Sequence, residues 1–439
     1  MNFADSDEMV REFAQRGFSR SENEQAADAV LVNTCTVRDH AEHKAMSYIG
    51  SLKPWKDDHP DRLLIVTGCA AERVKDNLKK RFPFLDLVVG AKDIESFPEE
   101  LDQILNSRPL QEENLIPLPL AASLGSASPV VQFVTIMRGC NYSCSYCIVP
   151  QVRGREKYRA IPDIVKDVEI RLLEGAKEIW LLGQTVNSYQ PPDPPFADYD
   201  FADLLRDVNA IAGVKRIRFM SPHPHYLTPK LITALAECEN VCEQIHLPVQ
   251  SGSTAVLKRM KRTYTRQSYL QGISELKKRI PKIALTTDVI VGFPGETEGD
   301  FAETLTLMEE VGFDNAYCFK YSPRPGTLSG SWEDDILTEV KEERLGRLLN
   351  VVESFGQIKA KAFIGSEQEV LIEEELSPGV FRGKTRGAWK VRFHEANLTP
   401  GDIITAHITG THSRELHGEG VKSQLETFQS GNKKFQVET

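Results

Sequence analysis

Three cysteines stand within eight residues of this 439-residue chain, at Cys140, Cys144 and Cys147. Three thiolates can hold three irons of a cubic [4Fe–4S] cluster and leave the fourth iron open, whereas an electron-transfer cluster usually takes a fourth cysteine. The spacing therefore predicts a cluster that binds a small molecule. The alternatives are a zinc site with a distant fourth ligand, and a cysteine-rich loop that binds no metal.

The elements that must position these cysteines follow from the hydrophobic pattern. From about residue 130, six strand-like runs alternate with helical patterns, namely VQFVTIMR, EIWLLG, RIRFMS, QIHLPV, ALTTDVIVGF and AYCFKY. Six β/α units are too few for a closed TIM barrel and predict an open, partial barrel, whose site lies at the carboxyl ends of the strands. Cys140 comes directly after the first of these strands. Thr297 and Asp300 are predicted to cap the helix after the fifth.

Two more cysteines end strands in the first part of the chain. Residues 1–108 alternate helical patterns with short apolar runs and predict a small parallel α/β sheet. Cys35 ends VLVNTC and Cys69 ends LIVTGC. Unpaired cysteines in such positions are usually packing residues, although ligands also gather at strand ends of an open sheet. Residues 109–129 are rich in proline and small residues, which predicts a linker.

The last part of the chain changes to short strands separated by turn residues, which predicts a small antiparallel β-barrel over residues 363–430. Basic side chains cluster in two runs, either of which could be an ordinary solvated face or a phosphate-binding surface. In the C-terminal run they are interleaved with aromatic residues, a combination suited to folded RNA. The two runs are Lys258, Arg259, Lys261, Arg262 and Arg266, and Arg382, Lys384, Arg386, Lys390 and Arg392.

Composition narrows the class of protein. The hydrophobic fraction is 41%, the charged fraction is 26% and the formal net charge is −10. These values are typical of a globular chain, and no apolar run is long enough for a membrane span or signal peptide. We therefore expect a cytoplasmic protein with reduced cysteines. Cys238, Cys242 and Cys318 are expected to be packing residues.

The C-x3-C-x2-C spacing after the first strand of a six-unit barrel resembles the radical S-adenosylmethionine enzymes. The resemblance implies that S-adenosylmethionine binds the open iron, and that one electron cleaves its sulfonium to give a 5′-deoxyadenosyl radical. Taken alone, the segment GFPGE at residues 292–296 could be an ordinary glycine turn, and Tyr146 could be a residue that packs in the barrel. The cofactor contacts that the resemblance implies are Tyr146, Gly183, Gln184, Gln250, Ser253, Asp288 and Gly292.

Six longer sequence motifs indicate which family of that superfamily the chain resembles. NTCTVRDHAEHK, TGCAAE, RGCNYSCSYCIVPQVRGRE, LLGQTVNSY, HLPVQSGS and DVIVGFPGET together resemble the methylthiotransferase family, and RGRE with GQTVNSY resembles its MiaB-type members, the tRNA-2-methylthio-N6-dimethylallyladenosine synthases. The resemblance implies a radical core over 130–362 and an auxiliary [4Fe–4S] cluster on three N-terminal cysteines. Cys35 and Cys69 match the second and third. The first has no counterpart here, so either the chain starts late or this site lacks one ligand.

The same resemblance implies a reaction and its partners. The expected reaction adds a methylthio group to C2 of N6-(dimethylallyl)adenosine at position 37 of tRNA. Alternatives are a methylthiotransferase acting on N6-threonylcarbamoyladenosine or on a ribosomal-protein aspartate, and a non-catalytic iron–sulfur protein that binds tRNA. A monomer is expected, with an electron donor such as flavodoxin or ferredoxin. The RNA contacts expected for the anticodon stem-loop are Arg153, Arg155 and, in the TRAM-like barrel, Arg382, Lys384, Arg386, Trp389 and Lys390.

Overall fold

The structure is a computed structural model that describes residues 1–36, 39–107, 130–192, 198–395 and 398–421. The linker predicted at 109–129 and the last residues of the predicted C-terminal domain lie outside these ranges. The chain divides into two compact units, residues 1–358 and 359–439, and each is described by itself.

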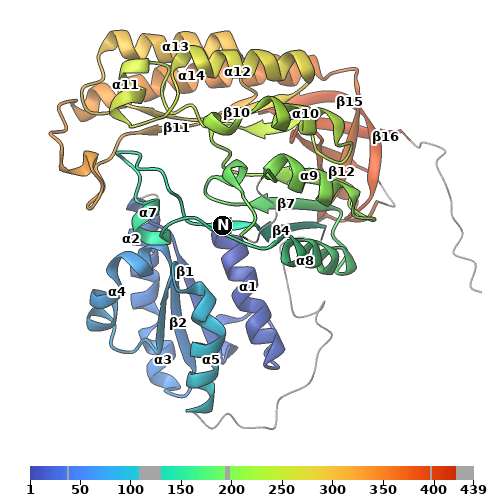
Figure 1. Ribbon diagram of the computed structural model, residues 1–439. Coiled ribbons are helices and arrows are strands. Elements are labelled where there is room, and N and C mark those ends of the chain that lie inside the picture. The colour runs from blue at the N-terminus through green and yellow to red at the C-terminus, as the bar shows by residue number, and fades with distance from the viewer. Residues whose placement is uncertain (37–38, 108–129, 193–197, 396–397, 422–439) are drawn as a thin grey trace, which may run out of the picture. The chain divides into compact units, whose positions relative to one another are not determined.

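The first unit begins with a three-stranded parallel sheet in the order β1-β2-β3, as predicted. Apolar side chains of α2, α3 and α4 cover one face of the sheet, while those of α1 and α5 cover the other (Figure 1). The elements in chain order are α1 (Asn2–Gln15), β1 (Ala29–Thr34), α2 (Asp39–Ser51), α3 (Lys53–Asp58), β2 (Leu63–Gly68), α4 (Cys69–Arg81), β3 (Leu87–Gly90) and α5 (Phe97–Asn106).

The same unit continues into an open barrel of six parallel strands. Two sheets, β4-β7-β8 and β9-β10-β11, are joined by a single bridge between Ile217 and Val241. The predicted partial barrel is thus confirmed. Its elements are β4 (Val131–Thr135), β5 (Met137–Arg138), α7 (Val149–Arg153), β6 (Lys157–Tyr158), α8 (Ile161–Leu173), β7 (Glu178–Leu182), α9 (Phe201–Ala210), β8 (Arg216–Phe219), α10 (Pro229–Glu237), β9 (Gln244–His246), α11 (Thr254–Arg259), α12 (Arg266–Arg279), β10 (Ala284–Val291), α13 (Glu298–Val311), β11 (Asn315–Lys320) and α14 (Thr338–Ala362).

Alternation along the barrel strands separates a helix-covered face from an interior face. In β10, Leu285, Val289 and Val291 are buried in the core beneath the helices, whereas Thr286 and Asp288 point to the other side. Figure 1 shows α12, α13 and α14 running along β10 and β11. The predicted cap of α13 is confirmed, because the side chains of Thr297 and Asp300 form a capping box.

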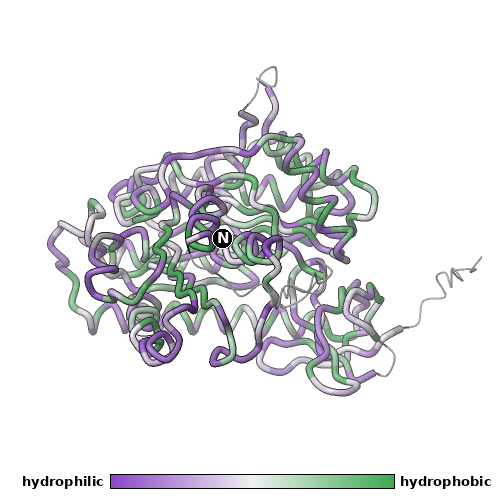
Figure 2. The backbone as a smooth tube through the Cα atoms, turned by 90° about the horizontal axis from the view of Figure 1, so that it is seen from below, coloured by the Kyte–Doolittle hydropathy of each residue, from purple (hydrophilic) through white to green (hydrophobic). Residues whose placement is uncertain are grey.

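Hydropathy along the backbone agrees with this arrangement. In Figure 2, hydrophobic stretches run through the inside of the first unit and hydrophilic stretches run mostly along its outside. Burying apolar surface in this way is the main source of stability of such a fold. Within the described ranges, no helix is long and apolar enough to cross a membrane.

The second unit is a closed five-stranded barrel in the order β12-β13-β14-β16-β15. Four of its strand pairs are antiparallel, as predicted, but β14 and β16 pair in parallel and close the barrel. The segment VFRGKTRGAWKVRF, expected as one strand, forms two strands, β13 and β14, and β16 was not expected from the sequence. The strands are β12 (Glu367–Ser377), β13 (Val380–Thr385), β14 (Lys390–His394), β15 (Ile403–His412) and β16 (Glu415–Val421).

Candidate metal centre

The three closely spaced cysteines lie on one loop between β5 and α7, just past the carboxyl end of β4. Gly139 opens this loop with a φ of +79°, and a Cβ there would overlap the carbonyl group of Arg155. Backbone bonds from Cys140 N to the Gly154 carbonyl and from Ser145 N to the Met260 carbonyl, both 3.1 Å long, fasten the loop to its neighbours. The fold therefore holds the cysteines in place by itself.

The three thiols are close enough to affect each other's ionisation. Burial, and then the neighbouring thiols Cys144 and Cys140, raise the pKa of Cys147 to about 12. Burial raises the pKa of Cys140, and Cys144 acts in the same direction. Bound iron would offset this cost by stabilising the thiolates.

A cubic cluster suits this arrangement better than a single metal ion. Among the described residues, no three His, Cys, Asp or Glu side chains are placed to hold one ion together. A cubic cluster does not need them to converge, because each thiolate binds a different iron. The soft thiolate ligands and their spacing fit a [4Fe–4S] cluster.

Arg262 brings a positive charge to this loop. Its Nη1 donates to Cys144 Sγ at 3.2 Å, its Nε donates to Tyr264 Oη at 2.9 Å, and its guanidinium lies 5.0 Å from the centre of the Tyr264 ring. From the sequence, Arg262 belongs to a basic run that could be a solvated face or a phosphate-binding surface. The structure supports neither for Arg262, because its side chain is directed at a cysteine of the candidate site.

We expect Arg262→Gln to lower the reduction potential of the cluster by roughly several tens of millivolts, because a nearby cation and an N–H···S bond favour the more negative, reduced state. An anaerobic redox titration followed by electron paramagnetic resonance measures this shift. Arg266→Gln is the matched control, since Arg266 bonds to Glu310 on α13. Equal potentials in the Arg262 variant and the wild type would contradict the prediction.

Gly183 and Gln184 follow β7 directly, as the cofactor assignment requires. Both polar atoms of the Gln184 amide are buried without a hydrogen-bond partner among the described residues. Burying such a group destabilises the fold unless a ligand or water bonds to it. The unpartnered Gln184 amide is therefore the feature of this site that best fits a bound cofactor. Gly183 also has a packing reason, because a Cβ there would press on the Met137 side chain.

Gln250 and Asp288 meet across the end of the fourth and fifth strands. Gln250 has a φ of +70°, an uncommon conformation for a residue with a side chain, and its N–H bonds to the Asp288 carbonyl at 2.8 Å. Strained residues of this kind often lie at functional sites. The Asp288 carboxylate faces the barrel interior, where it lies 3.4 Å from His246 Nε2.

Three other predicted cofactor residues have structural roles. The Ser253 hydroxyl caps α11 and bonds to Asp300, which gives it a structural role, and its contact with the cofactor stays a prediction. Gly292 has a φ of +69° and donates its N–H to the Glu296 carboxylate at 2.9 Å, as an ordinary glycine turn does. Tyr146 packs edge-on against Phe293.

Cys35 and Cys69 lie side by side at the ends of β1 and β2. Gly68, with a φ of +99°, lets the two strand ends approach, because a Cβ there would overlap the Thr34 backbone. Burial raises the pKa of Cys69, and the Cys35 thiol acts in the same direction. The Met1 amino group is also close enough to Cys69 to interact with its charge. The start of α1 thus lies beside the two cysteines.

Arg153 joins this second cysteine pair to the first loop. Its Nη2 donates to Asp5 at 2.7 Å and to the Asn2 side chain at 3.0 Å, and the residue is only 6% exposed. The guanidinium also acts against burial to lower the pKa of Cys69. The predicted RNA contact of Arg153 is therefore wrong, because its charge is spent on α1 and the auxiliary site. Arg155 is exposed beside the loop.

The cations predicted to contact RNA in the second unit have acidic neighbours. Arg382 bonds to Glu374, and Lys384 bonds to Glu373 at 2.9 Å. Arg386 lies 4.0 Å from a carboxylate oxygen of β12, and Lys390 is exposed. Trp389 is 7% exposed and packs in the barrel core, so its predicted stacking on RNA bases is wrong.

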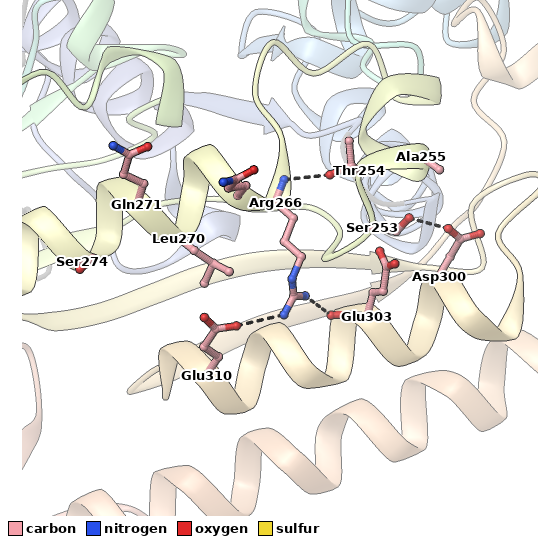
Figure 3. Close-up of a pocket in the computed structure, with 11 residues that line it drawn as sticks. Ser253, Thr254, Ala255, Arg266, Leu270, Gln271, Ser274, Asp300, Glu303 and Glu310 are labelled. Carbon is pink, nitrogen blue, oxygen red and sulfur yellow. Dashed lines mark hydrogen bonds and ion pairs between the residues drawn. The ribbon is translucent and has the colours of Figure 1, made fainter.

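A hollow on the helical side of the first unit is not a competing site. It lies between α11, α12 and α13 (Figure 3). Its polar groups satisfy one another, because Arg266 bonds to Glu310 and to the Glu303 carbonyl while Ser253 bonds to Asp300. Strand ends do not line it, and no cysteine reaches it. Cys238 and Cys242 are buried elsewhere, as expected for packing residues.

Three family models match the chain. The Radical SAM superfamily matches residues 134–308, an uncharacterized protein family designated UPF0004 matches 1–90, and the TRAM domain matches 361–421. These ranges coincide with the barrel that carries the three cysteines, the sheet that carries Cys35 and Cys69, and the closed C-terminal barrel.

Full-length relatives are similar over nearly the whole sequence. A protein of Clostridium botulinum (strain Loch Maree / Type A3) is 41% identical over 432 residues, covering 96% of this chain and 95% of the relative. One from Acetivibrio thermocellus is 40% identical over 437 residues, covering 96% of this chain and 89% of the relative. Both are named tRNA-2-methylthio-N(6)-dimethylallyladenosine synthase.

Solved structures resemble part of the fold. The radical S-adenosylmethionine methyltransferase TsrM of Kitasatospora setae, with cobalamin and a [4Fe–4S] cluster bound, aligns with a TM-score of 0.51 and 14% identity over 69% of this chain and 65% of that one. TsrM with its tryptophan substrate and a S-adenosylmethionine analogue aligns with the same TM-score over 73% and 66%. At this identity the likeness concerns the fold alone.

Proposed function

The chain belongs to the family of the tRNA-2-methylthio-N(6)-dimethylallyladenosine synthases, and we propose that it transfers a methylthio group to C2 of N6-(dimethylallyl)adenosine at position 37, beside the tRNA anticodon. The observation that carries this proposal is the loop of Cys140, Cys144 and Cys147, which the barrel holds in place and Arg262 contacts. An aromatic C–H resists acid–base chemistry, so a radical initiator matches the reaction.

The residues that would hold the cofactors are divided between two sites. Cys140, Cys144 and Cys147 hold one [4Fe–4S] cluster, and Cys35 with Cys69 contribute to the auxiliary one. When bound, the clusters and S-adenosylmethionine supply the electron, the radical and the methylthio group. The unpartnered Gln184 amide beside the first loop supports a place for S-adenosylmethionine there.

The protein's own part is to position these groups. Arg153 ties the auxiliary side to the loop through Asp5 and the neighbourhood of Cys69. A fully buried layer of Glu178, Arg216 and Arg218 fills the interior side of β7 and β8, with Arg218 Nε 2.9 Å from the carboxylate. This ion pair lies at the start of β7 and β8 and is itself shielded from bulk water.

The partner is proposed to be the anticodon stem-loop, with the target base turned out of its stack so that it reaches the barrel. The TRAM domain and Arg155 are the proposed RNA-binding surfaces. Flavodoxin or ferredoxin is the proposed electron donor, and we propose a cytoplasmic monomer.

Nucleoside analysis tests this function directly. We expect tRNA from a deletion strain to accumulate N6-(dimethylallyl)adenosine without its 2-methylthio group, and a plasmid copy of this chain to restore the product. The names of the relatives favour this substrate over the threonylcarbamoyl alternative. A deletion strain that instead lost methylthiolated threonylcarbamoyladenosine would overturn the assignment and leave the radical chemistry intact.

The double substitution Lys384→Ala with Lys390→Ala should weaken tRNA binding. It should also make the slope of log affinity against log salt concentration shallower by about one unit for each lost phosphate contact. Binding of tRNA measured across a range of salt concentrations reports both effects. The matched control is Lys215→Ala with Lys282→Ala, two exposed lysines that precede β8 and β10 at the ends away from the cysteines. A slope equal to that of the control would return this surface to an ordinary charged face.

A further inference from the structure

A second group of polar side chains lies on the interior face of β9, β10 and β11, apart from the cysteine loop. Ile245 and Leu247 are in the core beneath the helices, so His246 between them faces the interior. His246 is in register with Thr286 on β10, and Asp288 is in register with Tyr317 on β11. The three side chains of His246, Asp288 and Tyr317 therefore share one face of the sheet.

His246 holds this group together. Its Nε2 lies 3.4 Å from Asp288 Oδ2, and its Nδ1 lies 2.9 Å from Thr286 Oγ1. The Tyr317 ring approaches the imidazole at 5.8 Å between centroids, with the planes 66° apart. Because both ring nitrogens have partners and the residue is only 5% exposed, His246 fixes the direction of the Asp288 carboxylate.

The other two members keep groups available for a ligand. The Asp288 side chain is 30% exposed, and its second oxygen has no hydrogen-bond partner among the described residues. Tyr317 is 49% exposed although it lies on the inner face of the barrel. A carboxylate acceptor beside an open aromatic face suits a planar ring that carries an N–H donor.

A chain of contacts connects this group to the cysteine loop. The segment that follows β9 is held by Tyr264, whose hydroxyl donates to the carbonyls of Val249 at 2.9 Å and Pro248 at 3.1 Å. Arg262 contacts both Tyr264 and Cys144. His246 therefore lies on the strand whose following segment is fastened beside the candidate cluster. A reacting base would need to lie near that cluster.

We propose that Asp288 and Tyr317 bind the alkylated adenine of the substrate, with His246 as the positioning residue. This inference rests on the proposed function. Alkylation leaves the exocyclic N6 with a single N–H, which the Asp288 carboxylate accepts, and the Tyr317 ring stacks on the base. A hydrogen bond to a charged group and a base–aromatic stack are each worth enough to change affinity by about tenfold.

Binding of anticodon stem-loop RNAs to the reconstituted protein tests the proposal without relying on turnover. Three probes differ only at the target position, which carries N6-(dimethylallyl)adenosine, its N6-methylated derivative without an N–H, or an abasic site. We expect the wild type to bind the first about tenfold more tightly than the second. Asp288→Ala should bind the two RNAs that carry an alkylated base with equal affinity. Its affinity for the abasic RNA should match that of the wild type.

Tyr317→Leu should lose about tenfold in affinity for both base-containing RNAs and keep its affinity for the abasic one. Tyr48→Leu is the matched control, a 40% exposed tyrosine in the N-terminal sheet domain. His246→Gln should weaken the discrimination between the two alkylated bases without removing it. Iron content verifies that each variant is folded.

The outcomes separate this inference from the function on which it rests. A wild type that binds all three RNAs equally would overturn the proposed substrate. A wild type that prefers the alkylated base, with unchanged preference in Asp288→Ala and Tyr317→Leu, would overturn only the binding residues. If Asp288→Ala keeps its base preference and instead loses affinity for S-adenosylmethionine measured without RNA, Asp288 belongs to the cofactor site.

Discussion

Replacing Cys144 by alanine should reduce the reductive formation of 5′-deoxyadenosine from S-adenosylmethionine by more than about 100-fold, because loss of a ligand costs more than the 10–100-fold typical of outer-shell changes at a metal site. Cys144 is the ligand to choose, since it lies in the middle of the loop and accepts the Arg262 hydrogen bond. Product analysis after anaerobic reconstitution and reduction measures the effect.

Cys242→Ala supplies the control for this experiment. Cys242 is 3% exposed beside β9 and is a packing residue, so its replacement makes the same chemical change away from the loop. It should keep both its iron and its 5′-deoxyadenosine formation. Full activity in Cys144→Ala, or a failure of the folded wild type to form 5′-deoxyadenosine, would remove the radical assignment.

Features that depend on neighbouring residues could be predicted from the sequence. The six barrel strands follow from apolar runs bounded by turn residues, and the α13 cap follows from Thr297 and Asp300. The cysteine loop is equally local, because three ligands and a turn glycine lie within nine residues, from Gly139 to Cys147. Such signals survive folding because the residues that cooperate are adjacent in the chain.

Features that depend on distant partners could not be predicted. Arg153 and Arg262 looked like surface cations until the fold placed Asp5 beside one and Cys144 beside the other. Trp389 looked suited to RNA bases but fills the barrel core. A charge or a ring in the sequence does not reveal which group neutralises or covers it, since partners separated by 148 and 118 residues meet only in the folded chain.

His246 shows the same limit from the opposite direction. The pattern around it predicts a strand, but nothing in QIHLPV reveals that its side chain faces a carboxylate on the next strand and a tyrosine on the one after. The parallel strand pair that closes the C-terminal barrel is equally hard to predict. Because β14 and β16 are not neighbours in sequence, no hairpin pattern indicates that they pair. In both cases topology, and not local propensity, decides the contact.

Cys69→Ala should separate the two halves of the chemistry. The auxiliary site loses a thiolate, so methylthiolated tRNA should fall by more than about 100-fold while 5′-deoxyadenosine formation on the barrel cluster persists. Iron per chain should fall by about half in protein that holds both clusters, because the barrel ligands are untouched. Quantifying iron, 5′-deoxyadenosine and modified nucleoside in one sample distinguishes these effects.

The structure explains why losing Cys69 should leave the barrel cluster intact, and which contact still connects the two sites. Cys69 begins α4 in the N-terminal α/β domain, whereas the barrel loop is fastened by backbone bonds to Gly154 and Met260 that do not involve this residue. Arg153 is one direct link between the sites, so Arg153→Met should disturb the auxiliary cluster even though both of its described cysteines remain. Cys238→Ala, at the end of α10, is the control and should keep both the iron and the methylthiolated product. If Cys69→Ala retained full methylthiolation, Cys69 would not be a ligand and the sulfur would have to come from elsewhere.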